Sequence, residues 1–155
     1  MTDARSDAQA DDPFDLDRFV RAQQGVHDVA LDELRQGRKS SHWMWFVFPQ
    51  LAGLGRSATA ARYAITGTDE ARAYLAHPVL GPRLLAATDV ARHAPAHSAY
   101  ALLGGIDAVK LRSSMTLFAR VATDPQPFVA VLDRWYAGAE DPATVRLLGE
   151  RSGRE

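Results

Sequence analysis

The chain has 155 residues, a formal net charge of −1, 46% hydrophobic and 24% charged residues, and no cysteine. This length suits one domain with a real core, and the composition is that of a soluble globular protein for which we expect a cytoplasmic location without a membrane span. The absence of cysteine excludes disulfides and thiolate metal sites, and the near-neutral charge makes a nucleic-acid duplex a poor match as partner.

The two ends of the chain are predicted to be less ordered than its centre. Residues 1–12 carry five charged side chains and no large apolar residue after the initiator methionine, so we expect a disordered tail. Residues 13–149 should form one helical domain. Residues 150–155 should fray.

Asp-Pro pairs recur at three positions, Asp12-Pro13, Asp124-Pro125 and Asp141-Pro142. Aspartate is a good helix N-cap, and proline is tolerated at the first helical position because its missing N–H would be unpaired anyway. These starts favour a mainly α fold, and we predict a single-domain bundle of about seven helices with little or no sheet. The one place where an isolated strand is expected is 61–65.

Residues 16–34 place apolar side chains at helical spacing, and Gly25 either kinks this helix or divides it. Gln23 and His27 fall on the same apolar stripe, so two polar side chains should face inward. A buried histidine is more often a satisfied core residue than a catalyst. His27 and Gln23 are therefore secondary candidates for a ligand site.

The stretch 37–50 holds two of the three tryptophans, and we organise the sequence around it. Its run 43–48 is apolar on every face and far shorter than the roughly 20 residues of a membrane span, which predicts a segment at the centre of the core. Polar groups flank this run, and we interpret them with two of its aromatics as a pocket wall; the alternative is a core segment with solvated ends. The candidate ligand-binding residues of this stretch are Arg38, Lys39, Ser41, Trp43, Trp45 and Gln50, and His42 is a catalytic candidate.

A glycine-rich turn follows at 53–57. Gly53 and Gly55 allow successive backbone N–H groups to converge, Ser57 can cap the next helix, and Arg56 adds positive charge, so an anion such as phosphate could bind. The alternative is an ordinary turn, because the sequence matches no established phosphate-binding loop.

The helix predicted at 106–121 carries polar residues on its core side. Leu111, Leu117 and Phe118 define that side at 100° per residue, whereas Arg112, Thr116 and Arg120 lie opposite. Asp107, Lys110 and Ser114 share the core side, and Ser113 is added as a ligand-binding candidate. Asp107 and Lys110 must either neutralise each other as a structural ion pair or line a wet cavity.

Further helices are predicted at 68–76, 79–92, 100–103, 125–136 and 142–148, and the last two of them are interpreted as packing elements. His93 and His97 are four residues apart, but Pro95 breaks the helix that would align them, so we reject a metal pair there. We predict no metal site and no cofactor.

Four segments in order carry a family resemblance: GRKSSHWMWFVFPQ at 37–50, GLGRS at 53–57, HPVLGPRL at 77–84 and DAVKLRSSMTLF at 107–118. With them the chain resembles a bacterial domain family of unknown function, some members of which carry the label calpastatin, which we regard as a misannotation. The resemblance implies a small, mainly helical domain with no established activity or catalytic residues. Kinship with helical families acting on NAD-derived or ADP-ribosyl N-glycosidic bonds is a further expectation that no motif here carries.

Three functions follow from these patterns: a small-molecule enzyme acting on a nucleotide-like or phosphorylated ligand, a non-catalytic ligand-binding domain, and a protein-interaction domain with exposed tryptophans and an unidentified partner. For the enzyme we predict one polar cavity that joins Arg38 or Lys39 and His42 to the helix at 106–121. Asp107 would be a general base or orienting carboxylate, Lys110 an anion contact, His42 a proton carrier, and Ser114 a hydrogen-bonding group.

Overall fold

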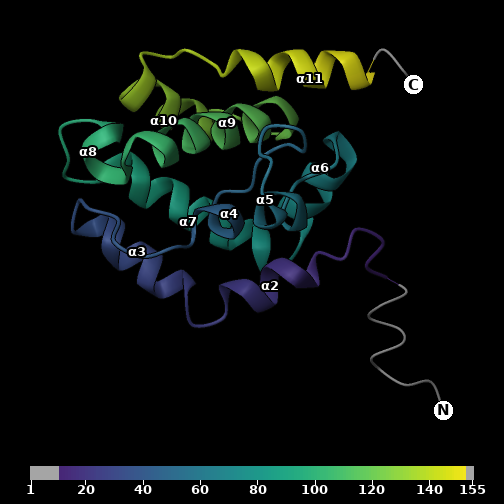
Figure 1. The fold of residues 1–155 in the computed structure, drawn as a ribbon, viewed down its shortest axis with the longest axis horizontal. Helices are drawn as coiled ribbons and strands as arrows, with labels where there is room; N and C mark the ends of the chain where they lie inside the picture. The colour runs from purple at the N-terminus through teal and green to yellow at the C-terminus, as the bar shows by residue number, and fades with distance from the viewer. Residues whose placement is uncertain (1–10, 153–155) are drawn as a thin grey trace.

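The computed structural model describes residues 11–152, which form ten helices and one isolated β-bridge (Figure 1). The helices are α2 (Asp17–Gln23), α3 (His27–Arg35), α4 (Met44–Val47), α5 (Ala58–Arg62), α6 (Thr68–Ala76), α7 (Leu80–His93), α8 (Ala99–Leu103), α9 (Gly105–Val121), α10 (Gln126–Tyr136) and α11 (Pro142–Ser152). No strand occurs in this part of the chain, so the prediction of a mainly α fold with little or no sheet is confirmed.

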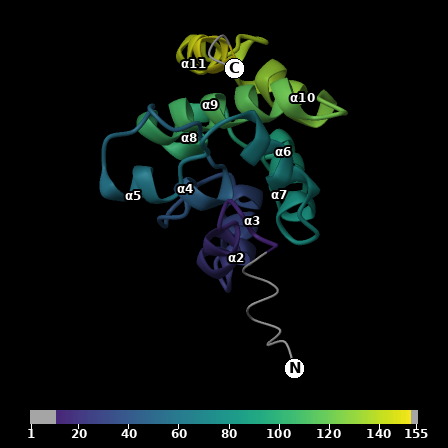
Figure 2. The same cartoon turned by 90° about the vertical axis from the view of Figure 1, so that its right-hand side faces the viewer.

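Helix α9 lies at the centre of the molecule and packs against α4, α6, α8, α10 and α11. In both views α11 covers one end of the molecule and α2 lies at the opposite end (Figures 1 and 2). The short helix α4 lies between these two ends and contacts both α2 and α9. The stretch 37–50, which contains α4, and helix α9, which carries Asp107, are therefore neighbours.

The predicted number of about seven helices is too low. Gly25 has φ +74°, a left-handed conformation that suits glycine, and it divides the predicted helix 16–34 into α2 and α3. The apolar run 43–48 adds a helix of its own, α4. Short helices of this kind leave no periodic pattern from which to count them.

The expected isolated strand at 61–65 is mostly wrong. Residues up to Arg62 belong to α5, and one residue of the range, Ile65, forms the parallel bridge with Leu51. Ile65 N–H donates to the Gln50 carbonyl at 2.8 Å, and Ala52 N–H donates to the Ile65 carbonyl at 2.8 Å. This bridge ties the segment after α4 to the segment after α5.

The aromatic run 43–48 is buried less completely than predicted. Trp43 and Phe48 have no exposed surface, but Trp45 and Phe46 are only partly buried. The reason is the helical conformation of α4, which directs successive side chains to different faces. Trp45 therefore lies at the edge of the core.

The face assignment on α9 is right for its apolar residues and wrong for Thr116. Leu111, Leu117 and Phe118 are buried as predicted, but Thr116 is buried as well. The Thr116 hydroxyl accepts a hydrogen bond from Asp141 N–H at 2.9 Å, because the segment before α11 covers this side of α9.

The first and last helices differ from the predicted ones in their bounds. The Asp12 carboxylate accepts hydrogen bonds from the N–H groups of Leu16 at 2.7 Å and Asp17 at 3.0 Å, but α2 begins only at Asp17 and its N-cap is Leu16, so the predicted helix start at Asp12-Pro13 is wrong. Residues 1–10 of the predicted tail lie outside the described residues. At the other end α11 continues to Ser152, and Arg151 donates to the carbonyls of Thr66 and Ala52, while the fraying expected at 150–155 stays a prediction.

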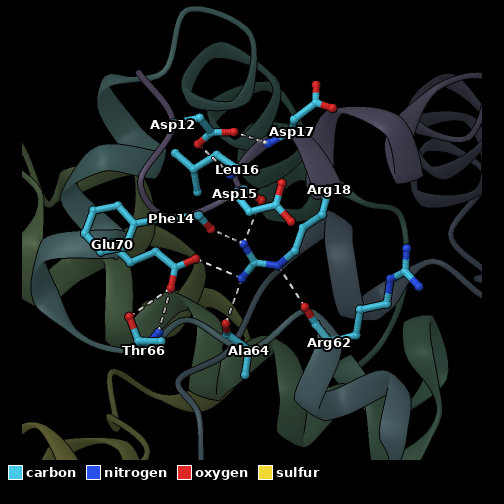
Figure 3. A network of polar contacts seen from close by, with 10 residues as sticks. All are labelled: Asp12, Phe14, Asp15, Leu16, Asp17, Arg18, Arg62, Ala64, Thr66 and Glu70. Carbon is cyan, nitrogen blue, oxygen red and sulfur yellow. Dashed lines mark hydrogen bonds and ion pairs between the residues drawn. The ribbon is translucent and has the colours of Figure 1, made fainter. Parts of the chain in front are cut away.

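A buried arginine joins α2 to the segments around α5 and α6 (Figure 3). The Arg18 guanidinium donates to the carbonyls of Phe14, Asp15, Arg62 and Ala64 and forms an ion pair of 2.8 Å with Glu70. Glu70 also accepts from the Thr66 N–H and hydroxyl, both at 2.9 Å. Every polar group here has a partner within the protein, which marks the network as structural.

None of the helices in the described range is both long enough and apolar enough to span a bilayer.

Candidate functional site

The charged residues of α9 meet the central stretch at a single carboxylate. Asp107 Oδ2 lies 2.9 Å from Lys39 Nζ, and Asp107 Oδ1 lies 3.3 Å from Lys110 Nζ. The side chains are 8% exposed for Lys39, 18% for Asp107 and 16% for Lys110. Two ammonium groups thus share one carboxylate in a mostly desolvated place, and we call these three residues the lysine cluster.

Both ammonium groups of the lysine cluster lie over indole rings. Lys110 Nζ is 3.6 Å from the centroid of the Trp45 ring, and Lys39 Nζ is 5.1 Å from that of Trp43. The attraction between a cation and the negative face of an aromatic ring contributes about 0.5–2 kcal/mol, more as the pair is desolvated. The two tryptophans therefore help to stabilise a positive charge that one carboxylate cannot neutralise.

The cluster uses every lysine in the protein. The sequence contains 16 arginines and two lysines, Lys39 and Lys110. Lysine carries a compact point charge on a flexible stem, whereas arginine carries a planar fork of donors, so the two are not interchangeable. This count was available from the sequence, and it distinguishes the two lysines from the other cations of the chain.

A further buried carboxylate contacts the loop that carries Lys39, namely Glu33 on α3, which was not among the predicted site residues. Its carboxylate accepts hydrogen bonds from the N–H groups of Ser40 at 2.7 Å and Ser41 at 3.0 Å, from the Ser41 hydroxyl, and from Trp43 Nε1 at 2.9 Å. Burial alone would raise the pKa of the Glu33 carboxyl. The hydrogen bonds from Ser41, Ser40 and Trp43 together have the larger effect and lower this pKa to about 2. Glu33 thus fixes the loop that carries Lys39.

A pocket of about 210 Å³ lies beside the lysine cluster. Its lining is mainly apolar and includes four alanines, and the complete set is Trp45, Gln50, Leu51, Ala52, Gly53, Gly55, Ala60, Ala61, Tyr63 and Ala64. The lysine cluster and the pocket share Trp45. Lys110 Nζ lies over its ring, and its side chain also lines the pocket. Four of the predicted ligand-binding residues, Trp45, Gln50, Gly53 and Gly55, line this pocket.

The predicted joint cavity forms only in part. Lys39, Asp107 and Lys110 come together as expected, but they do not line the 210 Å³ pocket. Arg38 and His42 point to the exposed side of the loop. The meeting of the two stretches is thus confirmed, whereas a shared cavity with Arg38 and His42 stays a prediction.

The two serines of α9 occupy different environments. The Ser113 hydroxyl donates to the Val109 carbonyl at 3.1 Å and to the Asp141 carboxylate at 3.0 Å, which ties α9 to the start of α11. Ser114 is fully buried, and its hydroxyl has no hydrogen-bond partner in the described part of the protein. The contacts of Ser113 are structural, whereas the Ser114 hydroxyl is unpaired among the described residues and closed to solvent.

The turn at 53–57 contacts other parts of the protein. Gly53 has φ +101° and packs against Leu147 and Arg151 of α11. Ser57 caps α5 as predicted, because its hydroxyl accepts from Ala60 N–H at 3.0 Å. Arg56 is exposed, and anion binding at this turn stays a prediction.

The secondary candidates Gln23 and His27 form no hydrogen bond with the lysine cluster within the described range. The Gln23 amide is buried and donates to the Phe46 carbonyl at 2.7 Å and to the Tyr74 hydroxyl at 3.0 Å. His27 has a buried Nδ1 without a partner among the described residues, and burial followed by the charge of Arg83 lowers the pKa of its imidazole, although Asp28 opposes this. Gln23 is thus a satisfied core residue.

A solved structure has the same fold. The crystal structure of the conserved hypothetical protein Rv1873 from Mycobacterium tuberculosis matches with a TM-score of 0.87 and 53% sequence identity, over 89% of this chain and 99% of that one. A search of curated proteins gives no match. The family model described as "Protein of unknown function (DUF1810)" matches residues 13–148. The chain therefore belongs to the DUF1810 family, as the resemblance of its motifs implied.

Proposed function

We propose that this protein is a small-molecule enzyme that binds a nucleotide-like anion, with a flat ring of the ligand in the pocket beside Trp45 and its charged part at the lysine cluster. The observation that carries this proposal is the convergence of both lysines of the chain on Asp107, directly over the tryptophan that lines the pocket. An aromatic wall and a surplus positive charge are thus adjacent.

The size of the pocket favours one ring system. An apolar cavity of about 150 Å³ can hold a benzene, whereas pockets for drug-sized ligands are about 300–1,000 Å³. The volume of about 210 Å³ beside Trp45 lies between these values, so the pocket suits a nucleobase or a pyridine-like ring. Gln50 supplies an amide that can donate to and accept from such a ring. The sugar and phosphate of the ligand would remain outside it.

The charge balance of the lysine cluster favours an anion. Two ammonium groups and one carboxylate leave one positive charge in a mostly buried place, where an unpaired charge is costly. A phosphate or carboxylate of the ligand would neutralise it. Lysine is well suited to this role because its ammonium, on a flexible stem, can turn toward a ligand, whereas arginine donates from a rigid planar group.

The chemistry would be electrostatic. Asp107 offers one oxygen to each lysine, so it acts as the orienting carboxylate, and Lys39 and Lys110 stabilise negative charge that develops on the ligand. His42, on the same loop as Lys39, is the candidate proton carrier, and Ser114 is a candidate hydrogen-bonding group. Action on an NAD- or ADP-ribose-related molecule would suit a pocket for a base-sized ring.

Of the alternatives, a binding domain without chemistry would use the same groups and differ only in turnover. The protein-interaction hypothesis is weaker, because it required exposed tryptophans, and Trp43 is fully buried while Trp45 is half-buried beneath Lys110.

The test is thermal unfolding with AMP, NAD, ribose 5-phosphate and nicotinamide as separate probes, followed by chromatography of each mixture to detect a product. A probe at 100 times its dissociation constant should stabilise the protein by about 2.7 kcal/mol, or about 5–10 °C for a chain of this size. Lys110→Met and Asp107→Asn should abolish the increase.

The matched control is Arg120→Met, since Arg120 lies on the same helix and pairs with Glu140 at 2.6 Å on the exposed surface. This variant should respond to the probe as the wild type does. Equal responses in Lys110→Met and the wild type would refute a role for the lysine cluster, and binding without any product would leave a binding domain in place of an enzyme.

A further inference from the structure

We infer that Glu33 is the positioning residue of this site: it holds the loop after α3 so that the Lys39 ammonium lies on Asp107. The relevance of this inference to ligand binding rests on the proposed function, but the geometry and its test do not require a ligand.

Glu33 accepts hydrogen bonds from three residues after Lys39, namely Ser40, Ser41 and Trp43. Its Oε1 accepts from Ser40 N–H, Ser41 N–H and Trp43 Nε1, and its Oε2 accepts from the Ser41 hydroxyl. All four donors are neutral, and the residue is 8% exposed. Since the carboxylate has no cationic partner among residues 11–152, its hydrogen bonds serve to order this loop.

The residues that Glu33 orders are the ones that surround Lys39. Lys39 Nζ donates to the Ser41 carbonyl at 2.6 Å and lies over the Trp43 ring. Glu33 binds both of these groups, through the Ser41 N–H and hydroxyl and through the indole N–H of Trp43. Two of the three contacts of the ammonium are therefore fixed by one carboxylate, and Asp107 supplies the third.

The other end of Lys39 is fixed as well. Its backbone N–H donates to the Leu102 carbonyl at 2.8 Å, which attaches the loop to α8. The flexible stem of the lysine therefore runs between two fixed points. Loss of Glu33 would free residues 40–43, whereas the backbone contact of Lys39 with α8 would remain, so the ammonium would leave Asp107 without unfolding of the domain.

The experiment measures how fast each lysine of the full-length protein is acetylated by acetic anhydride, with mass spectrometry of the peptides. The presence of only two lysines makes each signal unambiguous. In Glu33→Gln the acetylation of Lys39 should rise roughly tenfold, because hydrogen bonds to an ionised group are lost, while that of Lys110 should stay within about twofold. Trp43→Phe, which removes one hydrogen-bond donor to Glu33, should give a smaller increase in Lys39 acetylation. This variant tests the inference if Glu33→Gln does not fold.

The matched control is Glu70→Gln. Glu70 is a buried carboxylate of similar environment that binds Arg18 and Thr66, so its loss destabilises the protein without touching the Lys39 loop. An equal rise of Lys39 acetylation in Glu70→Gln, or no rise in Glu33→Gln and Trp43→Phe, would overturn the inference.

AMP binding measured on the same variants separates this inference from the proposed function. Weaker binding in Glu33→Gln than in Glu70→Gln supports both. If the wild type does not bind AMP and Lys39 acetylation still depends on Glu33, the positioning role stands and the proposed ligand is wrong.

Discussion

At the scale of single residues, the lysine cluster differs from the exposed ion pairs of the protein in burial and in partners. Pairs such as Arg21–Asp17 and Arg72–Asp69 lie along the surface of one helix, with side chains more than half exposed. Such pairs contribute little to stability. Lys39–Asp107–Lys110 instead joins two distant segments and lies mostly out of solvent, with each ammonium group over an indole ring.

The burial of the two tryptophans predicts different costs of their removal. Trp43→Ala should lower the free energy of unfolding by about 3–5 kcal/mol, because the ring is fully buried. Trp45→Ala should lower it by less, roughly 1–2 kcal/mol, since Trp45 is half-buried. Urea unfolding of both variants measures this difference, and equal losses would contradict the edge position of Trp45.

The lowered pKa of Glu33 predicts that the protein loses stability in acid. Its pKa is about 2 in the folded protein against 4.5 ordinarily, so the folded state favours the ionised form. This contribution is fully present above about pH 4.5 and is lost as the pH falls toward 2. Urea unfolding of wild type and Glu33→Gln should show a gap on the order of 2 kcal/mol at pH 7 that narrows between pH 4.5 and pH 2. A gap that did not change with pH would mean that the carboxylate charge is not what the loop requires.

At the scale of elements, two helical glycines differ in how closely other parts of the protein approach them. A Cβ on Gly81, in the first turn of α7, would lie 2.2 Å from the Leu75 carbonyl oxygen of α6, so the two helices can pack at this distance only with glycine. Gly149 in α11 faces open space. The same substitution should therefore have opposite effects at the two positions.

Gly81→Ala should destabilise the protein by roughly 2 kcal/mol or more, because backbone must move to admit the methyl group. Gly149→Ala should stabilise it by about 0.5–1 kcal/mol, because alanine favours the helix over the unfolded chain. Differential scanning calorimetry compares both with the wild type. Destabilisation by Gly149→Ala would show that α11 makes a contact at this position that the structure lacks.

At this scale the long helices could be predicted from the sequence, whereas a short one could not. The apolar stripe of α9 and the Asp-Pro starts of α10 and α11 were predicted from local pattern, and Asp124 and Asp141 do accept hydrogen bonds from Gln126 N–H and Thr144 N–H. Helix α4 was missed because four apolar residues have no period. Thr116 was placed on the wrong face because a covering segment 25 residues later in the chain cannot be inferred from α9 itself.

At the scale of the whole molecule, the fold class could be predicted but half of the site could not. The contact between Lys39 and Asp107 was expected, because buried charges on two segments stabilise each other when the segments are adjacent. Glu33 was missed because, between Asp32 and Arg35, it resembles a solvent-facing helix residue. Its burial depends on how the loop returns over α3, which tertiary packing decides.

The pocket beside Trp45 shows the same limit. Gln50, Gly53 and Gly55 were chosen for other reasons, as polar or flexible residues, whereas Tyr63 and the alanines of α5 carry no chemical signal in the sequence. They line the pocket because the bridge between Leu51 and Ile65 folds the two segments together. A long-range contact of one residue pair therefore determines the cavity.

The most direct measurement of the central claim is an NMR titration of protein labelled at lysine with ¹³C, in which Lys39 and Lys110 give the two side-chain Cε signals of the chain. The signals are assigned with Lys39→Met and Lys110→Met, and AMP is added to the wild type, to Asp107→Asn and to the Arg120→Met control. If a nucleotide-like anion binds at the lysine cluster, both Cε signals and the Trp45 indole N–H should shift with one saturating curve in the wild type and the control, and far less in Asp107→Asn. Unmoved lysine signals at millimolar AMP and at millimolar NAD would contradict the claim and leave Lys39–Asp107–Lys110 as a structural ion cluster.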